Sequence, residues 1–144
     1  MTIHRATIAD LDRLVPLFDA YRQFYEQPSD PAGGRAFLTE RFERGDSIVL
    51  IDADGVGFAQ LYPMLSSVRM RRTFILNDLF VQPDTRCRGL GHALLQAACD
   101  EARAAGAARM TLSTAVDNSA AHALYVRAGW KRDAQFHTYT IALD

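Results

Sequence analysis

The chain has 144 residues, 49% of them hydrophobic and 23% charged, and its formal net charge at pH 7 is −1. These values predict one globular domain, residues 1–144, that is long enough to bury a sizeable core. A protein that binds nucleic acid by neutralising phosphates needs a clear positive excess, so the charge balance argues against that class.

The sequence predicts neither export, nor membrane insertion, nor a metal site. The first residues, MTIHRATIADLDRL, lack the parts of a signal peptide, and no apolar run reaches the length of a membrane span. The two cysteines, Cys87 and Cys99, form no metal pattern with the four histidines and do not indicate a disulfide framework. We therefore expect a cytoplasmic protein.

The first elements in chain order are a short strand and a capped helix. Residues 2–6 predict the strand. Thr7 and Asp10 have the spacing of a capping box, and apolar residues then recur at helical spacing up to a turn cluster at 27–31. The elements predicted after that are a helix over 34–44, strands over 47–51 and 56–65 joined by a hairpin turn at 52–55, a strand over 73–81, a helix that ends near Gly106, a strand over 109–113, a helix over 118–127 and a final strand over 136–143.

Two further predictions concern the strand over 56–65 and the connection that follows it. Gly57 and Pro63 fall inside the strand over 56–65, which implies an irregular strand or one at a sheet edge. The connection 66–72 is rich in arginine, and we interpret it as a solvated hairpin end.

The most informative stretch follows the strand that ends at Val81. Pro83 and Asp84 favour a turn there, and the letters Arg86-Cys87-Arg88-Gly89-Leu90-Gly91 come next, before apolar residues at helical spacing. A glycine-bearing turn that opens a helix leaves backbone N–H groups free at the positive end of the helix dipole. The stretch therefore predicts an anion site, with phosphate as the usual occupant. It matches neither the P-loop nor the dinucleotide fingerprint.

The pattern Arg-x-x-Gly-x-Gly resembles the signature of the GNAT family of N-acetyltransferases. A second motif, Asn118-x-x-Ala121-x-x-Leu124-Tyr125-x-x-x-Gly129-Trp130, is similar to that family's second conserved block and lies at the usual distance downstream. The resemblance implies an α/β fold: a single GNAT-like domain with a central mixed, mostly antiparallel sheet flanked by helices.

The resemblance also implies acetyl-CoA as cofactor. The backbone of the turn would contact the pyrophosphate, and Phe80 and Val81 would form strand-like hydrogen bonds with the pantetheine arm, although their side chains are better explained as ordinary core. In the family the central strand splays from its neighbour at this point, often at a bulge, and frees N–H groups for the thioester oxygen. The residues that the resemblance assigns to the cofactor are Phe80, Val81, Arg86, Cys87, Arg88, Gly89, Leu90, Gly91, His92, Asn118 and Tyr125.

Two of the assigned residues in the second motif have alternative explanations. Asn118 can contact the cofactor arm, cap the helix, or do both. Tyr125 matches the family's general acid, since a phenol of pKa near 10 can protonate a thiolate of pKa about 8.5. The alternative for Tyr125 is a tyrosine packed beside Leu124 and Ala121 at helical spacing.

The amine acceptor is less well defined by the sequence. The letters Asn77-Asp78-Leu79-Phe80-Val81 resemble the polyamine and histone-tail acetylating branch, which often carries two acids there, whereas Asn77 cannot act as a base. Asp78 either orients a cationic amine or hydrogen-bonds within the sheet. Tyr21, Tyr25, Glu26 and Asp30 lie on the first helix and the loop after it, which flank the acceptor pocket in the family. Of these, Tyr25 and Glu26 are the candidates for substrate binding, because an acid beside aromatic rings suits an alkylammonium group; a solvated helix end is the alternative for Glu26 and Asp30.

We therefore expect an acetyl-CoA-dependent N-acetyltransferase that acetylates a primary amine of a small molecule, polyamine-like or amino-acid-like. Transfer would be direct, in a ternary complex, with Tyr125 and Asp78 as the catalytic candidates. The alternatives are a protein or peptide lysine acetyltransferase and, from another class, a non-catalytic acyl-CoA-binding regulatory module. Dimers are common in the family, and the last predicted strand offers an interface for a homodimer.

Overall fold

The computed structural model describes residues 2–86 and 88–144, which form two compact units, 1–113 and 114–144. Each unit is considered by itself below. The elements of the first unit are β1 (Ile3–Arg5), the 3-10 turn η1 (Ile8–Asp10), α1 (Leu11–Phe24), α2 (Pro31–Arg44), β2 (Ile48–Asp52), β3 (Gly57–Ser66), β4 (Arg71–Val81), the 3-10 turn η2 (Pro83–Thr85), α3 (Leu90–Ala104) and β5 (Met110–Thr111). The second unit contains α4 (Ser119–Arg127).

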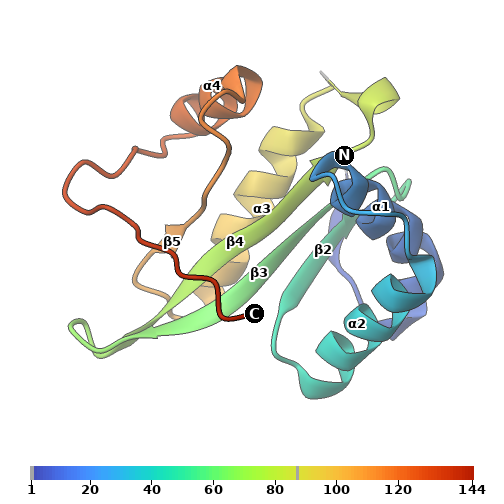
Figure 1. The fold of residues 1–144 in the computed structure, drawn as a ribbon, viewed down its shortest axis with the longest axis horizontal. Helices are drawn as coiled ribbons and strands as arrows, with labels where there is room; N and C mark the ends of the chain where they lie inside the picture. Colours follow the sequence, from blue (N-terminus) through green and yellow to red (C-terminus); the bar gives the residue numbers. More distant parts are fainter. Residues whose placement is uncertain (1, 87) are drawn as a thin grey trace. The chain divides into compact units, whose positions relative to one another are not determined.

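The described strands form one five-stranded sheet in the order β1-β2-β3-β4-β5 (Figure 1). Neighbouring strands are antiparallel except for β4 and β5, which are parallel. The predicted mixed, mostly antiparallel sheet is therefore confirmed. None of the helices in the described residues is long and apolar enough to cross a membrane.

Helices cover both faces of this sheet (Figure 1). The predicted capping box is present, since the Thr7 side chain accepts from a backbone N–H while the Asp10 side chain accepts from the Thr7 N–H, and α1 follows. Leu14, Phe18 and Leu38 from α1 and α2 pack with Phe58 and Phe80 in the core. On the other face, a Cβ added at Gly57 would lie 2.8 Å from the Leu90 side chain, so α3 approaches β3 closely there.

The pairing of β3 with β4 contains a bulge at Asn77. Gln60 pairs with Asp78, but the next residue of β3, Leu61, pairs with Leu76, which leaves Asn77 as an extra residue on β4. Leu76 and Asp78 consequently lie on opposite faces of the sheet, although they are two positions apart. Asp78 reaches the face that α1 and α2 cover.

Among the described strands, Pro63 lies where β3 extends beyond β2, so the expectation of a sheet edge at this position is confirmed on that side. Pro63 pairs with Phe74 of β4, and Phe74 donates its own N–H to Arg109 on the other side. The Pro63 nitrogen therefore points away from β4, toward the side where β2 pairs only as far as Leu61. No ladder hydrogen bond is lost there.

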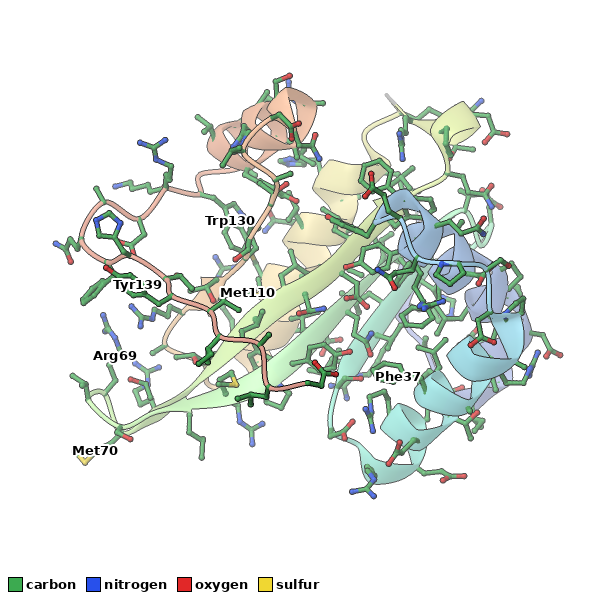
Figure 2. All side chains as sticks on the ribbon, viewed as in Figure 1. Phe37, Arg69, Met70, Met110, Trp130 and Tyr139 are labelled. Carbon is green, nitrogen blue, oxygen red and sulfur yellow. The ribbon has the colours of Figure 1, made fainter. Side chains whose placement is uncertain are left out.

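The β3–β4 hairpin continues beyond β2 to a basic and apolar tip. Val68 is 95% exposed and Met70 is 88% exposed. Figure 2 shows Arg69 and Met70 at this tip, pointing away from the sheet. The interpretation of this connection as a solvated hairpin end is consistent with these positions.

The second unit contains one correction to the predicted elements. The predicted helix is confirmed as α4, with Asn118 as its N-cap. The predicted final strand over 136–143 is wrong, because no described residue after α4 lies in a strand. Its alternating apolar residues are exposed, for example Tyr139 at 90% (Figure 2). Alternation favours a strand only when a neighbouring strand supplies hydrogen bonds.

Candidate active site

The glycine turn opens α3 as the sequence predicts. Gly89 is the N-cap residue, with φ of 80°, a left-handed conformation that favours glycine. No side chain caps this helix end, and the first N–H groups of a helix have no partner within it. The backbone of Leu90, Gly91 and His92 therefore presents donors at the positive end of the α3 dipole.

The two arginines of the turn differ in their surroundings. Arg86 Nε donates to the Val81 carbonyl at 2.9 Å, and the Arg86 guanidinium lies 5.7 Å from the centre of the Phe80 ring. Arg86 thus ties the turn back to the end of β4. Arg88 is exposed. Cys87, which was also assigned to the cofactor, lies outside the described residues.

The edge of β4 beside β5 is open beyond the first few pairs. Among the described residues, β5 pairs with β4 at Phe74 and Ile75 alone. Past the bulge, the Gln82 N–H donates to Val56 on the β3 side, so strand alternation turns the backbone groups of Leu79 and Val81 toward the open edge. An extended ligand arm could therefore pair with this edge as an added strand would.

A cavity of about 380 Å³ lies on the face of the sheet that α1 and α2 cover, between these helices and the centres of β3 and β4. Phe37, labelled in Figure 2, stacks on Phe18 at 5.7 Å in its wall. Gly33 and Gly34 pack closely in the cavity wall, since an added Cβ would collide with the Asp30 carboxylate at Gly33 and lie 3.3 Å from the Phe18 ring at Gly34. The residues that line it are Phe18, Tyr21, Arg22, Asp30, Gly33, Gly34, Phe37, Tyr62, Asn77 and Asp78.

Asp78 is the buried carboxylate of this cavity. Its exposed fraction is 2%. Gln60 Nε2 donates to its Oδ2 at 2.6 Å, and Asn77 Nδ2 donates to its Oδ1 at 2.6 Å. The Tyr21 hydroxyl interacts with the same carboxylate and donates to the Asn77 carbonyl at 3.1 Å.

Burial sets the protonation behaviour of these groups. Burial raises the pKa of Asp78, and the hydrogen bonds from Asn77, Gln60 and Tyr21 oppose that increase. Burial, followed by the nearby negative charge of Asp78, raises the pKa of both Tyr21 and Tyr62. The two tyrosines are therefore neutral phenols, while Asp78 takes up a proton more readily than an exposed aspartate does.

The predicted acceptor residues Tyr25 and Glu26 lie at the C-terminal end of α1. Both are exposed, and the Tyr25 ring meets the Tyr21 ring edge to face at 5.2 Å. Glu26 has a left-handed φ of 64°. Neither lines the cavity, which Tyr21 and Asp30 do, and their role in binding an acceptor stays a prediction.

The second unit carries Asn118 and Tyr125. Asn118 Oδ1 accepts from the Ala121 N–H at 3.2 Å, so its N-cap role is confirmed. Tyr125 is half-buried on α4, and its ring centre lies 6.2 Å from that of Trp130. The cofactor and acid roles of these two residues stay predictions.

The comparisons with known proteins agree with this arrangement. The sequence pattern of the acetyltransferase (GNAT) family matches residues 14–130, most of the chain. The chain belongs to the GNAT family. As a member it is an acetyl-CoA-dependent N-acetyltransferase, the class of enzyme that the sequence predicts.

Relatives of this GNAT protein match it along nearly its whole length. An uncharacterized N-acetyltransferase, YhfO of Bacillus subtilis (strain 168), is 44% identical and covers 98% of this chain and 97% of its own. An L-methionine sulfoximine/L-methionine sulfone acetyltransferase of Pseudomonas aeruginosa is 30% identical over 93% of this chain and 82% of its own. A crystal structure of a probable acetyltransferase superposes with a TM-score of 0.94, at 40% identity, and covers 100% of this chain and 99% of its own.

Acetyl-CoA, which GNAT enzymes generally use, fits the residues of the first unit. The α3 N-terminus has no capping side chain, and Gly89 lets a phosphate approach the backbone. The open edge of β4 offers the N–H and carbonyl of Leu79 and the N–H of Val81 to an extended arm, while the Val81 carbonyl accepts from Arg86. Among the described residues, no group of His, Cys, Asp and Glu side chains could hold a metal ion.

Sequence reasoning missed several residues in and around the cavity, and three of them carry polar side chains. Arg22 and Tyr62 line it, and Gln60 lies behind it with an exposed fraction of 0%. The signal for Gln60 and Tyr62 was available, because they alternate with Ala59 and Leu61 and so share the face of Phe58. Arg22 gives no such signal, since a helical arginine near a turn is usually solvated.

Proposed function

We propose that this enzyme transfers an acetyl group from acetyl-CoA to the amine of a small, amino-acid-like molecule that binds in the α1–α2 cavity. One observation carries the proposal: Asp78, a buried acid, and Arg22, a base, both line the same cavity. Arg22 Nη1 donates to the Pro28 carbonyl at 3.1 Å, which holds the side chain in place. An amino acid carries an ammonium and a carboxylate that match these two charges.

The chemical roles proposed for the side chains are those of acid–base catalysis. Acetyl-CoA supplies the acetyl group as a thioester. An alkyl amine near pKa 10 is protonated at neutral pH, so a group must take its proton before nitrogen can attack. Asp78, with its raised pKa, accepts that proton. The nitrogen loses its second proton to water as the tetrahedral intermediate collapses, while Tyr125 gives a proton to the departing sulfur and recovers one from solvent.

The hydrophobic wall of the cavity supports a small acceptor. Phe18 and Phe37 form an aromatic surface for an apolar side chain, and the relative that acetylates methionine sulfoximine and methionine sulfone acts on acceptors of this kind. The proposal also places the enzyme in the cytoplasm, with acetyl-CoA and the amine as its small-molecule partners. A polyamine or a lysine side chain would need only the acidic part of the cavity.

Thiol release from acetyl-CoA tests the proposal, with acceptors that differ by a single carboxylate. The pairs are L-methionine with 3-(methylthio)propylamine and L-lysine with cadaverine, and spermidine and a lysine peptide complete the panel. We expect release with the amino acids, a clear preference over the decarboxylated partners, and a steep loss in Tyr125→Phe.

Other outcomes separate the alternatives. Preference for spermidine or cadaverine would replace the amino-acid acceptor with a polyamine, and preference for the peptide would indicate a protein acetyltransferase. If acetyl-CoA raises the melting temperature but no amine releases thiol, a regulatory acyl-CoA-binding module becomes the better explanation.

A further inference from the structure

Gln60 is a buried polar side chain that the transfer reaction does not itself use. It lies on β3 directly opposite Asp78, at the bulge, and its exposed fraction is 0%. A glutamine without access to water must find its hydrogen bonds inside the protein, because an unpaired buried amide is costly. Gln60 therefore needs specific partners on both ends of its amide.

Those partners arrange the amide in one orientation. Ser47 Oγ, at the start of β2, donates to Gln60 Oε1 at 2.9 Å, and Gln60 Nε2 donates to Asp78 Oδ2 at 2.6 Å. If the amide were turned over, its oxygen would face the carboxylate oxygen, and two acceptors would meet. The hydrogen bonds from Ser47 to Gln60 and from Gln60 to Asp78 thus direct an amide N–H donor at the carboxylate.

We propose that Gln60, oriented by Ser47, is a positioning residue that holds the Asp78 carboxylate in its proton-accepting state in the acceptor cavity. This inference rests on the proposed function, since it assigns Gln60 to the base of that reaction. A carboxylate with a donor on each oxygen keeps its charge more readily than a bare one at the same burial. Asn77 serves Oδ1 and Gln60 serves Oδ2.

The other charged and titratable groups around Asp78 come from the neighbouring elements. Tyr21 of α1 and Tyr62 of β3 are neutral phenols beside it. Arg22 and Asp30 line the same cavity from α1 and the start of α2. Arg41 and Asp46 act on Tyr62 with opposite signs. Gln60 differs from all of these because it does not titrate and is fully buried.

The test compares Gln60→Leu with Ser47→Ala and with Ser66→Ala, a matched serine substitution at the hairpin end of β3. Gln60→Leu should lower amine-dependent kcat/KM about tenfold at neutral pH, the loss expected for one hydrogen bond to a charged group. The acid limb of its pH profile should move to higher pH, so that activity recovers in alkaline buffer. Ser47→Ala should change the profile in the same direction by about twofold, and Ser66→Ala should not change it.

A double variant distinguishes positioning from structural support. In an Asp78→Asn background neither Gln60→Leu nor Ser47→Ala should lower activity further. A loss by the same factor at every pH, repeated in the Asp78→Asn background, would overturn the proposal. If Gln60→Leu does not fold, the pH profile of Ser47→Ala, measured with and without Asp78→Asn, tests the positioning role in its place.

A measurement without turnover separates this inference from the proposed function. The ¹³C resonance of the Asp78 carboxyl, assigned by its loss in Asp78→Asn, should titrate at higher pH in Gln60→Leu than in the unchanged protein. If that shift occurs but no amine is ever acetylated, the proposed function fails and the positioning role stands. If amines are acetylated and neither the titration nor the pH profile moves, the positioning role fails alone.

Discussion

The turn before α3 and the cavity beneath α1 and α2 are built by opposite means. At the turn, the useful groups are backbone N–H donors, and Gly89 contributes by having no side chain. In the cavity, the useful groups are side chains, and Asp78, Tyr21 and Arg22 converge from β4 and α1. One site is formed by consecutive residues and the other by residues that are far apart in the sequence.

The difference explains how each site can bind its ligand. A phosphate is the same in every molecule of acetyl-CoA, so a backbone cradle serves it without modification. An acceptor amine varies between enzymes, and side chains on a rigid sheet can vary with it. Substitutions should therefore act by steric and conformational effects at the turn and by charge in the cavity.

The largest effect is expected at the turn, from Gly89→Val. Valine is strained at φ of 80°, and its side chain would block the approach of a phosphate. We expect kcat/KM for acetyl-CoA to fall roughly a thousandfold, because several charge-assisted hydrogen bonds of about 1.5–3 kcal/mol each are lost. Gly106→Val is the matched control: Gly106 has φ of 76° at the other end of α3, with nothing within 4 Å of an added Cβ. It should lower stability alone, and an equal loss of acetyl-CoA affinity in both variants would contradict the backbone site.

The next largest effect is expected in the cavity, from Asp78→Asn. Removal of a general base lowers rates by about a hundredfold or more, and the acid limb of the pH profile should disappear. Asp19→Asn is the control, since Asp19 is also buried but accepts from Ser29, Gln23 and the Asp30 N–H. Steady-state kinetics across pH would count against Asp78 as the base if both variants lost activity equally.

A smaller effect is expected from Arg22→Gln, which keeps the length of the polar side chain but removes its charge. The preference for L-methionine over 3-(methylthio)propylamine should fall about tenfold, the loss of one charge-assisted hydrogen bond. The rate with the decarboxylated amine should stay the same. An unchanged preference would place the acceptor carboxylate elsewhere.

The smallest effect is on the free energy of unfolding. Its pH dependence should have opposite signs for the two buried aspartates, Asp78 and Asp19. The pKa of Asp78 is raised, so its contribution to stability is present at low pH and is lost as the pH rises through its folded pKa. The pKa of Asp19 is lowered by its hydrogen bonds, so its contribution is present above the ordinary pKa and is lost on acidification. Melting curves between pH 3 and 8 should show Asp19→Asn most destabilised near neutrality. The stability of Asp78→Asn relative to that of the unchanged protein should be highest at that same pH, because the asparagine carries no charge to bury.

Local signals were sufficient to predict the turn and most of the helices and strands. Gly89 and Gly91 follow Arg86 within the same short turn, and Thr7 and Asp10 form one capping box, so neighbours along the chain carry each pattern. The predicted helix starting at 34 begins at Pro31 instead, because Asp30 caps it and proline suits a first helical position.

The cavity and the final strand could not be predicted in the same way. The contact of Gln60 with Asp78 depends on the register of β3 with β4, and that register contains a bulge that the letters at 76–81 do not reveal. The alternation over 136–143 describes a segment that could pair, but a strand forms only with a partner. The missing information in both cases is which segments become neighbours.

The bulge at Asn77 changes the shape of β4 without changing which residues of β3 and β4 lie opposite each other. If Asn77 were deleted, Leu76 would still face Leu61 and Asp78 would still face Gln60, in a regular ladder. Every cross-strand neighbour would be preserved, whereas the bend and the outward-turned Asn77 carbonyl that accepts from Tyr21 would be lost. A chain shorter by one residue would thus keep the same pairs in a straight strand, so the inserted residue determines where the strand bends and not which residues it pairs.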